Sequence, residues 1–245
     1  MGINAGFSVR EFLMGCGQTE SQVLQLYPKY FECADAIHAH YTELVSHHHT
    51  EPAACKILAT SAHQYFLSAL RVSVAGLVPA VFPIARATLE SALYAHSIHA
   101  NPESAPIWVQ RDANDGSLET FKKTFTARKV LMQLKAAHPE LGKEVSWWYE
   151  TTIRHGAHPN QEGSLPHLDI SETSFGEPIV VLPMIYSYPP QASYIRNTLF
   201  ASIRTGGLAL KILTDVFDSD PFALVARGVA DQVAIELAAL VKSEG

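Results

Sequence analysis

Residues 57–100 constrain the fold most, because the only charged side chains in this long stretch are Arg71, Arg86 and Glu90. So apolar a segment belongs in a protein core, where charges must be paired or used. Arg86 and Glu90 stand four residues apart, which places them on one face of a helix. Residues 72–85 carry no charge, but a membrane-spanning helix needs about 20 apolar residues. We therefore expect a buried helical corner and no membrane segment.

The composition favours a single packed unit. Of 245 residues, 47% are hydrophobic and 17% are charged, which is typical of a globular chain. The net charge of −6 argues against a general nucleic-acid binder, although it leaves room for a local basic pocket. Cys16, Cys33 and Cys55 are odd in number and widely spaced, which favours reduced thiols and a cytoplasmic location. We expect one helical domain over residues 1–245.

Hydrophobic periodicity predicts an all-α bundle of six or seven helices with short connections. One helix is expected from residue 117 to the His138-Pro139 pair, and a turn over residues 76–83 is expected to lead into the helix of Arg86 and Glu90. Residues 1–18 lack a clear period and are expected to form a loose N-terminal arm, with Thr19 opening the first helix. Two runs with β-branched residues, 165–171 and 179–185, predict a short β-hairpin or extended insertion near residues 163–186. Gly206 and Gly207 in the expected C-terminal helices permit close helix packing. We therefore also expect self-association as a homodimer through these helices.

Arg86 and Glu90 have two interpretations. The first is an intrahelical ion pair that braces a buried helix, since buried charges come paired. The second makes them ligand-binding residues. A guanidinium has five donors, more than one carboxylate can satisfy, so backbone, another side chain or a ligand anion must approach Arg86. We name both as candidate ligand-binding residues for a small anion.

Arg154, His155 and His158 form a second polar cluster. Structurally, Arg154 and His155 suit a last helical turn, where cations complement the helix dipole, with His158 in the loop that follows. Functionally, Arg154 would bind a phosphate or carboxylate while the two histidines act as general acid and base. We name these three as candidate catalytic residues and expect them to meet Arg86 and Glu90 in one site.

The other histidines predict no metal centre. His96 and His99 follow Glu90 on the same expected helix, but the three do not share one face, so this helix alone would not chelate an ion. The run His47 to His49 suits an exposed polar turn. Neither a phosphate-binding glycine loop nor a zinc-protease motif occurs, and we expect no metal and no cofactor.

A family resemblance follows from these motifs. Over residues 82–159 an Arg-x-x-x-Glu helix precedes a short helix with Trp108 and a helix that ends in a His-Pro pair. This arrangement resembles bacterial helical proteins of unknown function that are likened to the HEPN class. The resemblance implies a helical bundle, often dimeric, and metal-independent ribonuclease activity in defence systems. HEPN proteins carry an Arg followed some positions later by a His, and Arg154, His155 and His158 match those residue types with three residues between Arg154 and His158.

Three classes of function remain open from the sequence. The first is a HEPN-like ribonuclease that uses Arg154, His155 and His158 on an RNA phosphodiester. The second is a module that binds a small anion through Arg86 and Arg154 without chemistry. The third is a structural or interaction protein.

Overall fold

The structure is a computed structural model of the chain, and it describes residues 8–47, 51–157, 169–172, 178–181 and 188–243. The described residues are overwhelmingly helical, so the prediction of an all-α bundle is confirmed. None of the described helices contains a segment long and apolar enough to cross a membrane.

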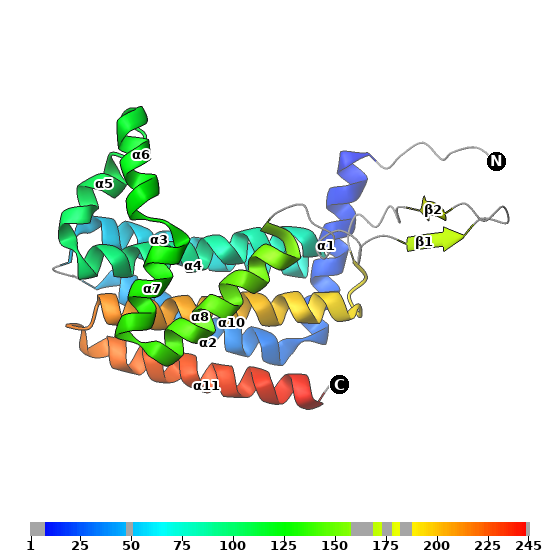
Figure 1. Ribbon diagram of the computed structural model, residues 1–245. Coiled ribbons are helices and arrows are strands. Elements are labelled where there is room, and N and C mark those ends of the chain that lie inside the picture. Colours follow the sequence, from blue (N-terminus) through cyan, green and yellow to red (C-terminus); the bar gives the residue numbers. More distant parts are fainter. Residues whose placement is uncertain (1–7, 48–50, 158–168, 173–177, 182–187, 244–245) are drawn as a thin grey trace.

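The helices and the two strands follow one another along the chain with mostly short connections (Figure 1). Their bounds are α1 (Val9–Leu26), α2 (Pro28–Ser46), α3 (Ala53–Val74), α4 (Val78–Ala100), the 3₁₀ turn η1 (Pro102–Ser104), α5 (Ala105–Val109), α6 (Asp115–Thr124), α7 (Ala127–Ala137), α8 (Pro139–Thr152), the π-helical turn η2 (Ile153–Ala157), β1 (Asp169–Glu172), β2 (Pro178–Val181), α10 (Ser193–Val216) and α11 (Pro221–Ser243).

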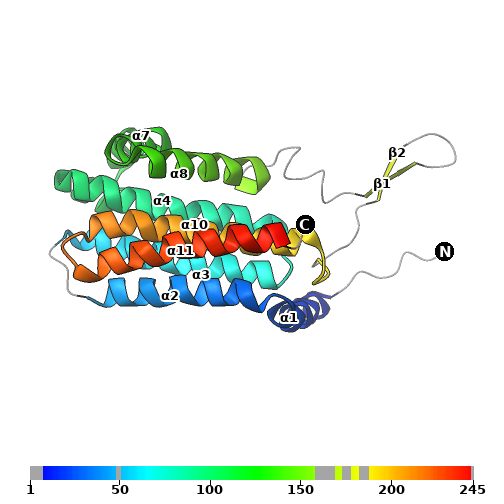
Figure 2. The ribbon, with the colours of Figure 1, turned by 90° about the horizontal axis from the view of Figure 1, so that it is seen from below.

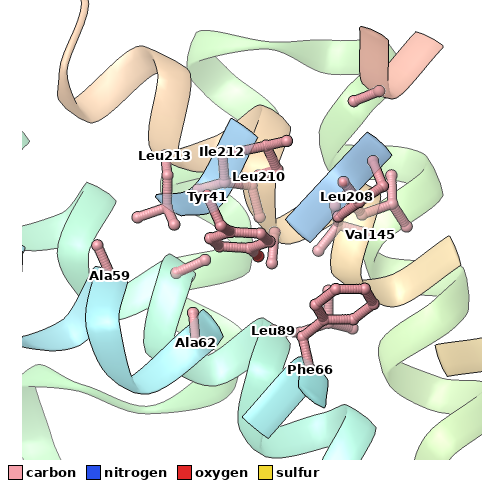
Figure 3. Packing of buried hydrophobic residues seen from close by; sticks show 14 of the residues in the cluster. Tyr41, Ala59, Ala62, Phe66, Leu89, Val145, Leu208, Leu210, Ile212 and Leu213 are labelled. Carbon is pink, nitrogen blue, oxygen red and sulfur yellow. The ribbon is translucent and has the colours of Figure 1, made fainter. Parts of the chain in front are cut away.

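Helix α10 is the centre of the bundle. It contacts α2, α3, α4, α8 and α11, and most of its residues are buried. Figure 3 shows Leu210, Ile212 and Leu213 of α10 beside the ring of Tyr41, whose hydroxyl donates a 3.0 Å hydrogen bond to the carbonyl oxygen of Gly206. In Figure 2, α7 and α8 lie over α4, on the side of the bundle opposite α2. The bundle therefore has three layers, with α4 and α10 between the outer helices.

The expected loose N-terminal arm is wrong for residues 9–18, which form the first half of α1. Ser8 caps this helix: its hydroxyl accepts from the Glu11 backbone at 3.2 Å, and its own N–H donates to the Glu11 carboxylate at 2.7 Å. This reciprocal pair is a capping box. Thr19, which was expected to open the helix, lies buried in its middle.

Two further boundaries differ from the expectation. The helix expected from residue 117 to the His138-Pro139 pair is divided into α6 and α7, and Thr126 caps α7 by accepting a hydrogen bond from the Lys129 backbone at 3.3 Å. The turn expected over residues 76–83 ends earlier, because α4 already begins at Val78 and carries Pro83 inside it. A proline at that position has no N–H to give to the carbonyl of Pro79.

Residues 163–186, where an insertion was expected, fall largely outside the described part of the chain. Within it, β1 and β2 pair antiparallel, with Asp169 opposite Val181 and Glu172 opposite Pro178. This two-stranded pair is the only sheet among the described residues. It follows η2 in sequence and precedes α10.

Candidate functional site

A three-residue polar cluster joins α4 to α8. The Nε of Arg86 donates to Glu90 Oε1 at 2.9 Å, and the Tyr149 hydroxyl donates to the same oxygen at 2.7 Å. The guanidinium also lies over the Tyr149 ring, 5.0 Å from its centroid, which is a cation–π distance. Arg86 and Glu90 are about one quarter exposed and Tyr149 is buried. The predicted pair thus forms, and a side chain from another helix completes it.

Contacts within the cluster keep Arg86 charged and Tyr149 neutral. Burial opposes a charge on Arg86, but the Glu90 carboxylate and Tyr149 outweigh it and raise the pKa of the guanidinium. Burial, followed by the hydrogen bond to Glu90, raises the pKa of Tyr149. At neutral pH the tyrosine is therefore a neutral donor, and the arginine keeps its positive charge.

Arg86 also lines a pocket of about 550 Å³ between α7 and α8. Its wall carries two further cations, Arg128 and Lys135, and one carboxylate, Glu150, all exposed. We call this the basic pocket. It is open to solvent, and apolar residues complete its lining: Ala127, Leu131, Met132 and Ile153. Even with Glu90, the ion-pair partner of Arg86, counted beside Glu150, the three cations outnumber the two carboxylates, so the local charge is opposite in sign to that of the whole chain.

The end of α8 packs against the start of α4. Pro83 leaves the carbonyl oxygen of Pro79 without its helical donor, and Gly156 of η2 approaches this oxygen so closely that a Cβ on Gly156 would lie 3.0 Å from it. The ring of His155 in the same turn lies against Phe82, with 5.3 Å between centroids. Close approach of η2 to the proline-containing turn of α4 therefore positions His155.

His155 lines a second, more enclosed pocket of about 360 Å³, which we call the aromatic pocket. Its other lining includes the rings of Phe82, Trp148, Tyr194 and Phe200. Trp148 and Phe200 contact each other with 5.8 Å between ring centroids. Polar side chains on its wall come from Thr151 of α8 and from the first two turns of α10: Arg196, Asn197 and Thr198.

The two pockets lie on opposite faces of α8. At 3.6 residues per turn, Trp148 and His155 fall on one side of α8 and η2, and Tyr149 and Ile153 fall on the other. His155 is thus half-buried in the aromatic pocket, while Arg86 lines the basic pocket. Phe82, which His155 contacts, lies one turn before Arg86 on α4, but the structure does not place His155 and Arg86 in one pocket as the sequence analysis expected.

The remaining predicted residues are placed only in part. Arg154 lies exposed in η2 and lines neither pocket. His158 falls outside the described residues. Sequence reasoning missed Tyr149, Arg128 and Lys135, since nothing in the sequence places α7 and α8 beside Arg86. The one available signal was the surplus of guanidinium donors, which required an approaching partner.

Comparisons of the chain with protein-family models, with curated proteins and with solved structures found no match. Inference about function therefore starts from the chemistry of the two pockets.

Proposed function

We propose that this protein binds a small anion of phosphate or carboxylate chemistry in the basic pocket. The observation that carries the proposal is the position of Arg86: partly buried, oriented by Glu90 and Tyr149, and part of the same wall as Arg128 and Lys135. Guanidinium groups bind phosphate and carboxylate through parallel N–H donors.

Pre-orientation is the main contribution of the cluster. The hydrogen bond from Nε to Glu90 and the stacking on Tyr149 hold the guanidinium plane in one place, so little side-chain freedom is lost when an anion arrives. The exposed Arg128 and Lys135 add charge that salt screens. Binding should therefore weaken as ionic strength rises, with Arg86 providing the part that resists salt.

The test is a calorimetric or NMR titration of the full chain with inorganic phosphate and with acetate at low salt. The double variant Arg128→Ala/Lys135→Ala should lose about tenfold or more in affinity, which corresponds to about 1.4 kcal/mol. Lys29→Ala is the matched control, because Lys29 is an exposed cation on α2, across the bundle from this pocket. Equal affinity in the double variant and in the wild type would refute the proposal.

HEPN-like ribonuclease activity is the second candidate, and the aromatic pocket favours it. Single-stranded RNA is recognised through bases that stack on aromatic side chains. His155 stands beside Phe82 in a wall that also holds Trp148 and Asn197. A stacked base would bring its phosphate near the imidazole of His155, the side chain most often used in general acid–base catalysis.

RNA cleavage in the presence of EDTA tests this candidate. His155→Asn and His158→Asn should each lower the cleavage rate at least about a hundredfold, the lower end for general acid–base catalysis, with little change in melting temperature. His40→Asn provides the control. Full activity in the His155 variant would exclude His155 as a catalytic residue, and activity that requires a metal would exclude a metal-independent mechanism.

A further inference from the structure

Three potential metal ligands converge at the end of the bundle where α4 and α10 terminate and α7 meets α8 (Figure 1). They are His96 of α4, His138 between α7 and α8, and Asp215 of α10. One ligand atom from each lies within 4.8 Å of the other two. Neither pocket described above includes any of them.

Two of these residues hold buried polar atoms that have no hydrogen-bond partner. The Nδ1 of His96 and the Oδ2 of Asp215 are both in this state, and the whole His96 residue is only 6% exposed. A buried polar group without a hydrogen-bond partner destabilises the folded protein, so each of these two atoms requires a physical explanation, of which a bound ion is one.

An ion-pair network explains only part of the cluster. His138 Nε2 lies 2.8 Å from Asp215 Oδ2, within ion-pair distance, yet this oxygen has no hydrogen bond of acceptable geometry. Arg227 of α11 pairs with the other carboxylate oxygen, Oδ1. Nothing in that network reaches His96. Its ring lies 6.4 Å from that of His138, centroid to centroid, and both belong to the same cluster.

We propose that His96, His138 and Asp215 form a binding site for a divalent transition-metal ion of the Zn²⁺ class. Two imidazoles and one carboxylate are the ligand set of catalytic zinc sites and of non-haem iron sites. Metal–ligand bonds of about 2.0–2.1 Å put tetrahedral ligand atoms about 3.3 Å apart, which small side-chain movements from the present separations achieve.

The surroundings suit such an ion. Arg227 binds Oδ1 of Asp215 and leaves Oδ2 facing the histidines, as partners of ligating carboxylates do in metal sites. The side chain of His138 is 37% exposed, so one side of the site opens to solvent. An ion held by three protein ligands keeps at least one coordination position for water or another small ligand.

Calorimetric titration of chelator-treated full-length protein with ZnCl₂ tests the site. We expect one Zn²⁺ per chain, with His96→Ala and Asp215→Asn each losing about tenfold or more in affinity, since even an outer partner of a metal ligand contributes about 10–100-fold. His47→Gln is the control, because His47 makes the same kind of contact, Nδ1 to Asp220 Oδ2 at 2.5 Å, outside the cluster. The same substitution removes one histidine from the run at residues 47–49, so it also tests whether that run binds Zn²⁺.

NMR of the wild-type histidine rings keeps the test independent of variant folding. Zn²⁺ should shift the ring nitrogen signals of His96 and His138 and leave those of His40 unchanged. The absence of Zn²⁺ binding would overturn the proposal and leave the cluster as an ion-pair network. Binding that only His47→Gln weakens would overturn it in favour of the histidine run.

Discussion

The hydroxyl of Tyr149 donates to Glu90 Oε1 at 2.7 Å, across the contact between α8 and α4. The same oxygen accepts from Arg86, so a single carboxylate atom both orients the guanidinium and ties the two helices together. Structural bracing and anion binding were separate interpretations of Arg86 and Glu90 in the sequence. This geometry makes them compatible, because the group that braces the helices also fixes the cation.

Tyr149→Phe isolates the contribution of that hydrogen bond. The variant keeps the ring beneath Arg86 but removes the donor, and the net loss should be about 1–2 kcal/mol in the free energy of unfolding. Urea denaturation measures it. Tyr65→Phe is the control, because Tyr65 is 43% exposed, and it should change stability by less than about 0.5 kcal/mol. Equal effects of the two variants would show that the Tyr149–Glu90 bond contributes nothing.

Gly206 and Phe66 test how tightly α10 packs on α3. A Cβ on Gly206 would lie 2.3 Å from Cδ2 of the buried Phe66 ring, so Gly206→Ala should destabilise the protein by about 1–3 kcal/mol through overpacking. Gly207→Ala is the matched control. Its Cβ would meet Ile37 at an ordinary 3.5 Å, and the better helix propensity should stabilise by up to about 1 kcal/mol. Thermal unfolding should show a lower melting temperature for Gly206→Ala and a higher one for Gly207→Ala than for the wild type.

His63 makes stability depend on pH. Its Nε2 lies 2.8 Å from His38 Nδ1, and its ring stacks on Tyr41 at 5.0 Å. Burial, with a smaller contribution from His38, lowers its pKa from 6.5 to about 4. As pH falls from about 6.5, the unfolded chain takes up a proton that the folded chain does not, so stability is lost between about pH 6.5 and 4 and is unaffected above.

Urea midpoints measured from pH 8 to pH 4.5 check the sign of this effect. His63→Gln should make the fall below pH 6.5 shallower without abolishing it, because burial lowers the pKa of His96 to about 4 as well. A wild-type slope in the His63 variant would assign the acid sensitivity to other groups.

Ser8→Ala should loosen the start of α1. The substitution removes the acceptor for the Glu11 backbone N–H, which costs about 0.5–2 kcal/mol at a helix N-terminus. Amide exchange in the first turn should accelerate by the corresponding factor. Ser21→Ala is the control within the same helix, because its exposed hydroxyl only donates to the Gly17 carbonyl and caps nothing. Unchanged exchange would show that the capping box does not hold α1.

The sequence predicts the local contact in the candidate site but not the contacts between distant helices. The spacing of Arg86 and Glu90 was sufficient to predict their pairing, because helix geometry alone sets an i, i+4 contact. Tyr149 lies 59 residues beyond Glu90, and no local rule predicts a contact over that distance. The expected meeting with His155 did not form, because Tyr149 and His155 lie on opposite faces of α8 and η2.

The errors in the fold arose where two local signals competed. Thr19 and Gln22 match a capping box as well as Ser8 and Glu11 do, and the glycines at 15 and 17 favoured the later start. In the structure the Ser8–Glu11 capping box forms, and the helix begins there. Likewise, the hydrophobic period from residue 117 onward predicts one helix, but Thr126 caps a second helix, α7, within that stretch.

The position of α10 along the chain also sets the order in which the core can be completed. During synthesis α2, α3, α4 and α8 emerge first, and the helix that all of them contact follows only after residue 192. Until then the apolar faces that will meet α10 have no final partner, and long-range contacts of this kind slow folding. The nascent chain thus exposes apolar surface that chaperones can bind until α10 has emerged.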